Sequence, residues 1–407
     1  MATRAQIIIR SCDRRVLELE WVKSWLVGNG MELSGEHRQV DPKADIIILT
    51  TCGVTQLHED FTFEMLERIK AEKKPEAMVI LGGCVPEINP ERTEGEFCGP
   101  TFSPKSYDRL DGILPLPRKL DEFARPNTYD MYASYRTDVG NVLGFARSLR
   151  GHYQDIRYVT QKFYEAVESR LRRQRTYLIQ IHEGCSQGCS YCAIQKAIGP
   201  LRNSKPVETV VQELNEGLAK GYRRIRLIGD SAGSYGLDKG TNLGVLLRRL
   251  SQVPGRFSLE LTDINPIFLR VIFEPVKELC AQGRLSSLYI PIQSGNERIL
   301  RLMRRCCDMA QVQHMLGEIR SAGRRGFKLG TSVIVGFPSE TDEELGETIR
   351  LCNEVDFDWV WCHGFSPRPG TPAATLPGQL SPEAVQERVR LFKASLHRPG
   401  AVILDFQ

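Results

Sequence analysis

Short apolar segments alternate with amphipathic helical segments in two parts of this 407-residue chain, and this alternation limits the fold more than any other feature. In the first 124 residues, three apolar runs (AQIIIRSC, ADIIILTTC and AMVILGGC) are separated by stretches with helical periodicity. Such an order predicts parallel strands covered by helices. We therefore expect residues 1–124 to form an open parallel sheet of the flavodoxin-like kind.

A second alternation begins near residue 176 and contains six predicted strands. Helical stretches such as VETVVQELNEGLAKG and LGVLLRRL separate them. Repeated strand–helix units predict a partial (β/α)6 barrel over residues 176–397. Residues 125–175, rich in aromatic residues and arginine, are interpreted as a connector, and residues 398–407 as a tail. The predicted class is α/β throughout. The six strands are expected at TYLIQIHEG, RIRLIGD, RFSLELTD, SSLYIPIQSG, FKLGTSVIVGF and DWVWCHGF.

Each of the three N-terminal strands ends in a cysteine. These residues are Cys12, Cys52 and Cys84. In an open parallel sheet, ligands gather at the carboxyl ends of the strands. We therefore expect three cysteines that are far apart in the sequence to converge on one site.

A second group of cysteines, Cys185, Cys189 and Cys192, follows the first predicted barrel strand. That position is the face of the barrel where such folds carry out chemistry. Three thiolates within eight residues can hold three irons of a cubane cluster and leave the fourth iron open. A zinc site is the alternative, with His182 as the only nearby fourth ligand, and simple buried cysteines are a further one.

The chain has no apolar run of the length that a signal peptide or a membrane span requires, so we expect a cytoplasmic protein without membrane contact. In a reducing compartment, its twelve cysteines are better explained as ligands, reactive thiols or small buried side chains than as disulfides. The net charge of +4 permits a polyanionic partner but does not require one.

The pattern Cys-x3-Cys-x-aromatic-Cys after a first barrel strand resembles the radical S-adenosylmethionine superfamily. The order of the N-terminal cysteines, together with GCSQGCSYC, LIGDSAGSYG, YIPIQSG, VIVGFPSET and FSPRPGTPA, resembles the methylthiotransferase family over most of the chain, from about Gln6 to Pro372. The resemblance implies two [4Fe-4S] clusters. The one on Cys185, Cys189 and Cys192 would bind S-adenosylmethionine through its open iron, and reduction would release a 5′-deoxyadenosyl radical. The second, on Cys12, Cys52 and Cys84, would take part in sulfur delivery.

Further residues at the predicted barrel mouth are candidates for binding the cosubstrate or the substrate. Tyr191 would lie near the adenine of S-adenosylmethionine, and a flavodoxin or ferredoxin is the expected external electron donor. For the other candidates, an ordinary strand–helix turn, a satisfied polar core or a glycine that relieves a turn is the alternative. These candidates are Gly229, Asp230, Ser231, Glu260, Thr262, Gln293, Ser294 and Gly336.

The chain also departs from the family's usual sequence. Three residues after Cys12 the family usually has asparagine, followed by an Asp-Ser pair, whereas this chain reads CDRRVLELE. Asn-Thr-Cys becomes TTC, and the Pro-x-x-Arg-Gly segment becomes QKAIGP. Family members usually carry an RNA-binding module, TRAM, after the radical domain; we expect none here, because only HRPGAVILDFQ follows the last predicted helix.

These departures favour a substrate other than a large RNA. We expect an enzyme that forms a carbon–sulfur bond by inserting sulfur from the auxiliary cluster into an unactivated C–H position. The substrate would be a nucleoside, a nucleotide or a peptide, for example in the biosynthesis of a specialised metabolite, and a nucleic-acid partner is disfavoured. The alternatives are a methylthiotransferase that acts on tRNA or on a ribosomal protein, and a non-catalytic iron–sulfur redox module.

Overall fold

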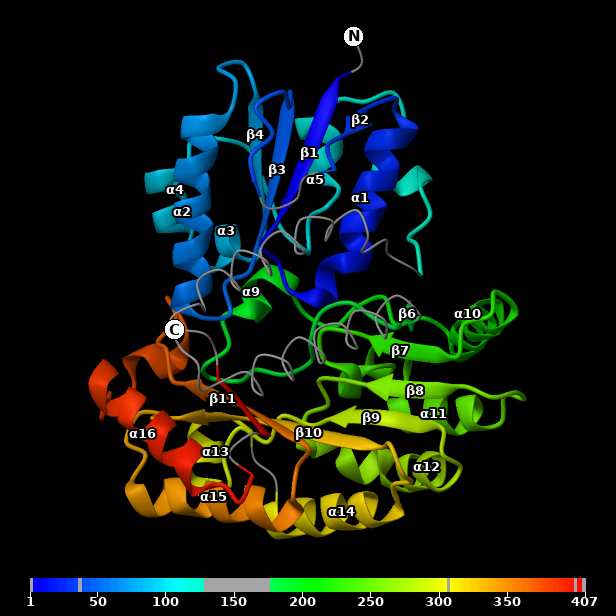
Figure 1. Cartoon of the computed structure of the whole chain (residues 1–407), viewed down its shortest axis with the longest axis vertical. Helices are drawn as coiled ribbons and strands as arrows, with labels where there is room; N and C mark the ends of the chain where they lie inside the picture. The colour runs from blue at the N-terminus through cyan, green and yellow to red at the C-terminus, as the bar shows by residue number, and fades with distance from the viewer. Residues whose placement is uncertain (1–2, 36–38, 128–175, 306–307, 399–400, 405–407) are drawn as a thin grey trace, which may run out of the picture.

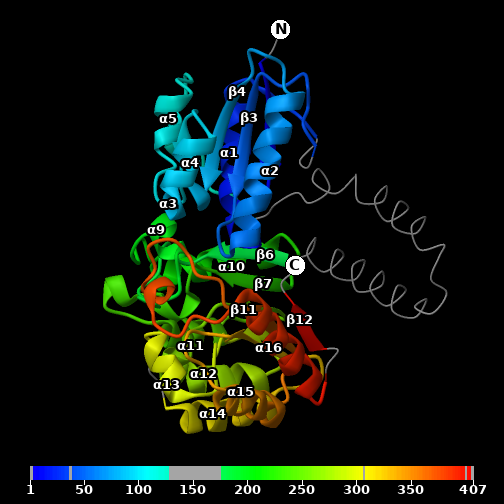
Figure 2. The same cartoon turned by 90° about the vertical axis from the view of Figure 1, so that its left-hand side faces the viewer.

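Two parallel sheets, one from each part of the chain, form two domains that pack against each other (Figures 1 and 2). The predicted α/β class is confirmed, with a parallel-sheet domain at the N-terminus and a second, larger one after it. Most of the predicted connector lies outside the described residues. The structure is a computed structural model that describes residues 3–35, 39–127, 176–305, 308–398 and 401–404.

The N-terminal sheet has the strand order β2-β1-β3-β4-β5, which is the flavodoxin-like order. Alternate side chains of β1 point to opposite faces, so Ile7 packs with Trp25 of α1 while Ile8 packs with Phe63 of α2. The short strands β2 and β5 were not predicted, because two residues are too few to show a pattern. The strands are β1 (Arg4–Ile9), β2 (Glu32–Leu33), β3 (Ile46–Thr51), β4 (Met78–Gly83) and β5 (Thr101–Phe102). The helices are α1 (Val16–Gly28), α2 (Gln56–Glu72), α3 (Val85–Ile88), α4 (Pro90–Glu96) and α5 (Arg109–Ile113), with 3-10 turns at Asp13–Arg15 and Leu120–Glu122.

The second sheet has seven parallel strands in the order β12-β11-β10-β9-β8-β7-β6. Six of them are the predicted strands, and the seventh, β12, lies in the segment interpreted as a tail. Val402 of β12 pairs with Val360 of β11. Its three residues are shorter than the four to eight that a sequence pattern needs to indicate a strand. The strands are β6 (Thr176–Gln180), β7 (Arg224–Ile228), β8 (Ser258–Leu261), β9 (Leu285–Tyr289), β10 (Lys328–Val335), β11 (Trp359–Gly364) and β12 (Val402–Leu404).

Helices cover the outer face of the second sheet (Figure 1). Their apolar residues pack with the strands in one large core. These helices are α10 (Val207–Ala219), α11 (Leu243–Ser251), α12 (Leu269–Ala281), α13 (Glu297–Leu302), α14 (Met309–Ala322), α15 (Asp342–Val355) and α16 (Pro382–Ser395). The short helix α9 (Ile194–Ile198) lies instead at the contact with the N-terminal domain. Single 3-10 turns lie at Ala232–Ser234, Leu237–Lys239, Pro266–Phe268 and Pro372–Thr375.

Apolar contacts join the two domains at two places. Cys84 and Ile88 of the N-terminal domain form a buried cluster with Ala193 and Ala197 at α9. A second cluster packs the start of α1 against β6 and β7. Cys84 is one of the three N-terminal cysteines, and α9 directly follows the loop that carries Cys185, Cys189 and Cys192. These contacts therefore hold the two groups of cysteines against each other.

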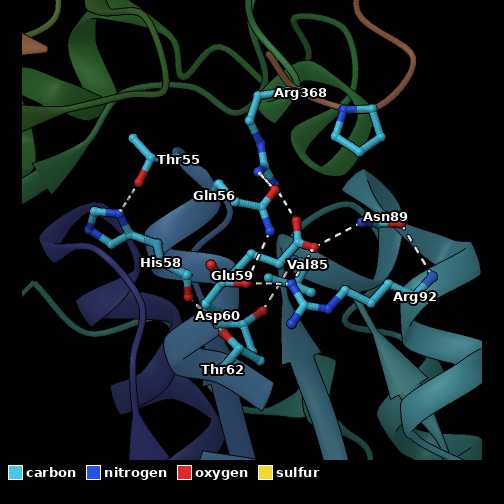
Figure 3. Close-up of polar contacts among 12 residues, drawn as sticks. Thr55, Gln56, His58, Glu59, Asp60, Thr62, Val85, Asn89, Arg92 and Arg368 are labelled. Carbon is cyan, nitrogen blue, oxygen red and sulfur yellow. Dashed lines mark hydrogen bonds and ion pairs between the residues drawn. The ribbon is translucent and has the colours of Figure 1, made fainter. Parts of the chain in front are cut away.

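A buried ion pair joins the domains beside the first of these apolar contacts (Figure 3). Arg368, in the loop after β11, pairs through Nη2 with Glu59 of α2, and its Nη1 donates to the side-chain oxygen of Gln56 at 2.9 Å. The other oxygen of Glu59 accepts hydrogen bonds from Asn89, at 2.8 Å, and Arg92, at 3.2 Å. Glu59 and Arg368 are 0% and 2% exposed. The helix that follows Cys52 is therefore fixed to the barrel by a charged contact.

The ten cysteines in the described part of the chain are all free thiols. Among the same residues, no helix combines the length and the apolar character that crossing a membrane would require.

Candidate functional site

The three N-terminal cysteines lie at the carboxyl ends of neighbouring strands. Cys52 follows β3 directly, Cys84 follows β4 directly, and Cys12 lies three residues beyond β1. The strand order reverses at β1 and β3, and such switch points are where open α/β sheets bind ligands. Cys52 and Cys84 are buried, and Cys12 is exposed. The structure therefore brings the three thiols to one end of the sheet, the end that faces the barrel.

The three thiols differ in how readily they ionise. A hydrogen bond with the Cys52 thiol lowers the pKa of Cys12 to about 5, and the guanidinium groups of Arg14 and Arg15 add to this effect. The same hydrogen bond, together with burial, holds the pKa of Cys52 well above its usual range. Burial raises the pKa of Cys84 to about 12. Cys12 is therefore the thiol that ionises most readily before any metal binds. Cys52 and Cys84 would lose their protons when a metal cluster binds.

The second group of cysteines lies in the loop between β6 and α9. Gly184, which opens this loop, has φ +73°, and a Cβ atom there would lie 2.0 Å from the carbonyl oxygen of Pro200. The backbone N–H of Gln187 donates to the sulfur of Cys185 at 3.3 Å, and the N–H of Cys192 donates to the carbonyl of Cys189 at 3.2 Å. The loop is thus wound tightly around its sulfur atoms.

Arg305 contacts this loop and was not predicted from the sequence. Its Nη1 atom lies 3.6 Å from the sulfur of Cys189 and 3.4 Å from the hydroxyl of Tyr191, while Nη2 donates to the carbonyl of Pro291 at 2.5 Å. The side chain is buried. In the sequence, nothing distinguishes Arg305 from the neighbouring Arg304, which has φ +56° and turns the chain after α13. The adjacent Cys306 and Cys307 lie outside the described residues.

The candidates at the end of β7 organise the loop and the contact between domains. A Cβ atom on Gly229 would lie 2.2 Å from the ring of His182, so only glycine lets this buried ring pack there. The backbone N–H of Ser231 faces Nε2 of the same ring at 3.5 Å. One oxygen of Asp230 accepts from the N–H of Gly184 at 2.8 Å, and the other pairs with Arg15 of the N-terminal domain.

The candidates at β8 and β9 have different surroundings. Glu260 is paired with Arg226 of β7, at 2.8 Å from its Nε atom, and Thr262 is half-buried. The hydroxyl of Ser294 lies 3.3 Å from that of Thr348 and accepts from a backbone N–H at the start of α13. These contacts engage Glu260 and Ser294 within the protein.

Gln293 is the predicted residue whose side chain most clearly suits a bound molecule. Its φ is +70°, unusual for a residue other than glycine, and its amide oxygen is buried without a hydrogen-bond donor. Buried acceptors are normally satisfied, so this oxygen fits a donor group of a bound cosubstrate or substrate. Gly336 has φ +74° and donates its N–H to Glu340 at 2.7 Å, so a turn is sufficient to explain its glycine.

Among the residues that the structure describes, no group of three His, Cys, Asp or Glu side chains is arranged to hold a single metal ion. The fit to iron–sulfur clusters therefore rests on the positions of the cysteines at the strand ends and on the N–H groups directed at their sulfurs. Backbone and guanidinium donors to cysteine sulfur are typical surroundings of such clusters.

Comparisons with known proteins define the class of this chain. Residues 179–352 match the model of the radical SAM superfamily, and residues 4–98 match that of the Uncharacterized protein family UPF0004. The match identifies residues 179–352 as a radical S-adenosylmethionine domain, and the cofactors that such a domain implies are S-adenosylmethionine and one [4Fe-4S] cluster. The superfamily predicted from the cysteine spacing is thereby confirmed.

Curated relatives place the chain among the homologues of methylthiotransferases. One is the threonylcarbamoyladenosine tRNA methylthiotransferase MtaB of Thermotoga maritima, 29% identical, with 89% of this chain and 76% of the relative covered. Another is the tRNA-2-methylthio-N(6)-dimethylallyladenosine synthase of Vibrio vulnificus, 28% identical, with 89% of this chain and 70% of the relative covered. The resemblance inferred from the sequence motifs is confirmed over most of the chain.

Solved structures show the same fold at low sequence identity. The radical S-adenosylmethionine methyltransferase TsrM of Kitasatospora setae, solved with tryptophan and a SAM analogue, superposes with a TM-score of 0.62 at 13% identity, covering 100% of this chain and 92% of that one. The cobalamin-dependent radical enzyme OxsB gives a TM-score of 0.52 at 13% identity, covering 98% and 58%. The arrangement of an N-terminal parallel sheet on a radical SAM barrel is thus shared.

Proposed function

We propose that this enzyme forms a carbon–sulfur bond by inserting sulfur, held at the N-terminal cysteines, into an unactivated C–H position of a substrate at the barrel mouth. The observation that carries the proposal is that two groups of three cysteines lie at the carboxyl ends of two parallel sheets, and that these ends meet at the domain contact. One group would serve radical formation and the other sulfur delivery. The residues are Cys185, Cys189 and Cys192 for the first and Cys12, Cys52 and Cys84 for the second.

When bound, the clusters and S-adenosylmethionine supply the one-electron chemistry and the sulfur, while the protein orients them and excludes water. Arg305 donates toward the sulfur of Cys189 and holds the hydroxyl of Tyr191. The unpartnered oxygen of Gln293 accepts a hydrogen bond from the cosubstrate or the substrate. The apolar contact between Cys84 and α9 keeps water out of one side of the space between the two sites.

We propose a small substrate, such as a nucleoside, a nucleotide or a peptide side chain. The two cations beside Cys12 support this choice, because each is already paired with a carboxylate. Arg14 pairs with Asp263 at the end of β8, and Arg15 pairs with Asp230 and Glu18. Binding a nucleic acid depends on cations that are available to phosphates. Arg14 and Arg15 are therefore not available to phosphates in this way.

An adenosine of tRNA is the second candidate, favoured by the names of the curated relatives. Mass spectrometry of bulk tRNA and of the small-molecule extract, from cells with and without the active enzyme, separates the two candidates. We expect a sulfur-containing compound in the extract. A methylthio-adenosine in tRNA, with an unchanged extract, would overturn the small-substrate proposal and leave the sulfur chemistry intact.

The reaction class is tested by iron content and by cleavage of S-adenosylmethionine. Anaerobically reconstituted protein should hold about eight irons as two cubanes and release 5′-deoxyadenosine on reduction. Replacing Cys185, Cys189 and Cys192 by alanine should leave about four irons and abolish 5′-deoxyadenosine. If that triple variant kept the full iron content, the assignment of ligands would be wrong.

A further inference from the structure

Asp230, at the end of β7, accepts hydrogen bonds from both domains. Its Oδ2 atom accepts from the backbone N–H of Gly184, the residue that precedes Cys185, at 2.8 Å. Its Oδ1 atom is paired with Nη2 of Arg15, which lies in the N-terminal domain. The Arg15 and Asp230 side chains are 8% and 5% exposed. One buried carboxylate therefore links the loop of the radical-site cysteines to the other domain.

Arg15 is in turn tied to the loop of the sulfur-site cysteines. Its backbone N–H donates to the carbonyl of Cys12 at 3.0 Å and closes the turn that carries this cysteine. Its Nη1 atom donates to Glu18 at 2.7 Å, which fixes the direction of the guanidinium group. Three hydrogen bonds in series thus connect the carbonyl of Cys12, through Arg15 and Asp230, to the peptide next to Cys185.

This contact does what the apolar contacts between the domains cannot do alone. Burial of apolar surface is non-directional, so the cluster at Cys84 and α9 does not by itself fix the orientation of the two domains. The ion pairs of Arg368 with Glu59 and of Arg14 with Asp263 also join the domains, but neither involves the loop of the radical-site cysteines. A guanidinium group presents several N–H donors in a rigid plane and can fix two carboxylates at once. Lysine carries the same charge on a single ammonium group and cannot hold two carboxylates in one plane.

We propose that Arg15 is a positioning residue that, through Asp230, fixes the separation and orientation of the two cysteine groups. A sulfur atom and a substrate carbon must meet at one distance for a bond to form, and small displacements reduce the rate strongly. Arg15 sets this geometry without touching the substrate. The inference rests on the proposed function in one respect, which is that both cysteine groups hold clusters.

The test replaces Arg15 by lysine and, separately, Asp230 by asparagine. Arg298→Lys is the matched control, because Arg298 makes a two-pronged contact with Glu344 within the barrel. Pulsed dipolar EPR on the reduced protein measures the distance between the two clusters. We expect one narrow distance in the wild type and the control, and a distribution about twofold broader in Arg15→Lys and Asp230→Asn.

Amide hydrogen exchange provides a readout that does not need the clusters. Peptides that contain Cys12 and Gly184 should exchange about tenfold faster in both test variants, with β9 and β10 unchanged. If Arg15→Lys unfolds throughout, Asp230→Asn decides the question, since it retains an oxygen for Gly184. Wild-type distance and exchange in both variants would overturn the positioning role. A wild-type protein with only one cluster would instead contradict the proposed function, and exchange alone would then decide the role of Arg15.

Discussion

Removing the charge of Glu59 should destabilise the protein more than removing that of its partner Arg368. In Glu59→Gln, the guanidinium of Arg368, 2% exposed, keeps only neutral acceptors such as Gln56. A buried charge without a counter-charge costs about 3–5 kcal/mol. In Arg368→Gln, the carboxylate of Glu59 still accepts from Asn89 and Arg92, so we expect a loss of about 1–3 kcal/mol.

Unfolding in urea, followed by tryptophan fluorescence, measures both losses. Trp25 lies in the N-terminal domain and Trp359 in the barrel, so the signal reports on both domains. The exposed pair of Arg249 and Glu208 is the control, with side chains 39% and 70% exposed, and its removal should cost about 0.5 kcal/mol. If Glu59→Gln and Arg368→Gln each cost no more than the control, the buried pair would not stabilise the domain contact and our reasoning would be refuted.

Three further predictions follow from single residues of the site. Burial lowers the pKa of His182 to about 4 from 6.5, so its contribution to stability is complete above pH 6.5 and is lost as the pH falls toward 4. Between pH 7 and pH 5 the loss should be about 2 kcal/mol in the wild type and absent in His182→Phe, as measured by urea midpoints at the two pH values, and an equal drop in stability in the two proteins would contradict it. Arg305→Met should lower the midpoint potential of the radical-site cluster in a redox titration, because donors to cysteine sulfur raise it, and an unchanged potential would rule out this contact. Gln293→Leu should weaken S-adenosylmethionine binding about tenfold in calorimetry, the value of one hydrogen bond, whereas unaltered affinity would assign its oxygen to the substrate.

The parts of the fold that could be predicted are those with a local pattern. The ends of β3 and β4, directly before Cys52 and Cys84, could be predicted because apolar runs locate strands of this length. The strand β12 was missed because three residues carry too little pattern. The placement of the cysteines at one end of each sheet then follows from the rule for parallel sheets.

The partners of the polar residues could not be predicted, because they come from distant parts of the chain. Arg15 and Asp230 are 215 positions apart, and Glu59 and Arg368 are 309 positions apart. No periodicity relates such residues. Gly229 illustrates the same limit, since its glycine is required by the ring of His182, a residue on the neighbouring strand's loop. Sequence patterns could locate candidate residues such as Asp230 at a strand end. Their partners, such as Arg15, follow only from how the two domains pack.

The most direct test of the proposed chemistry is the variant in which the three N-terminal cysteines, Cys12, Cys52 and Cys84, are replaced by alanine. Because the cysteines of the barrel loop are unchanged, we predict that this variant still releases 5′-deoxyadenosine on reduction with S-adenosylmethionine. Its iron content should fall from about eight to about four, and mass spectrometry should detect no sulfur-containing product. Product formed at the wild-type rate would contradict the claim that these cysteines hold the sulfur that enters the substrate.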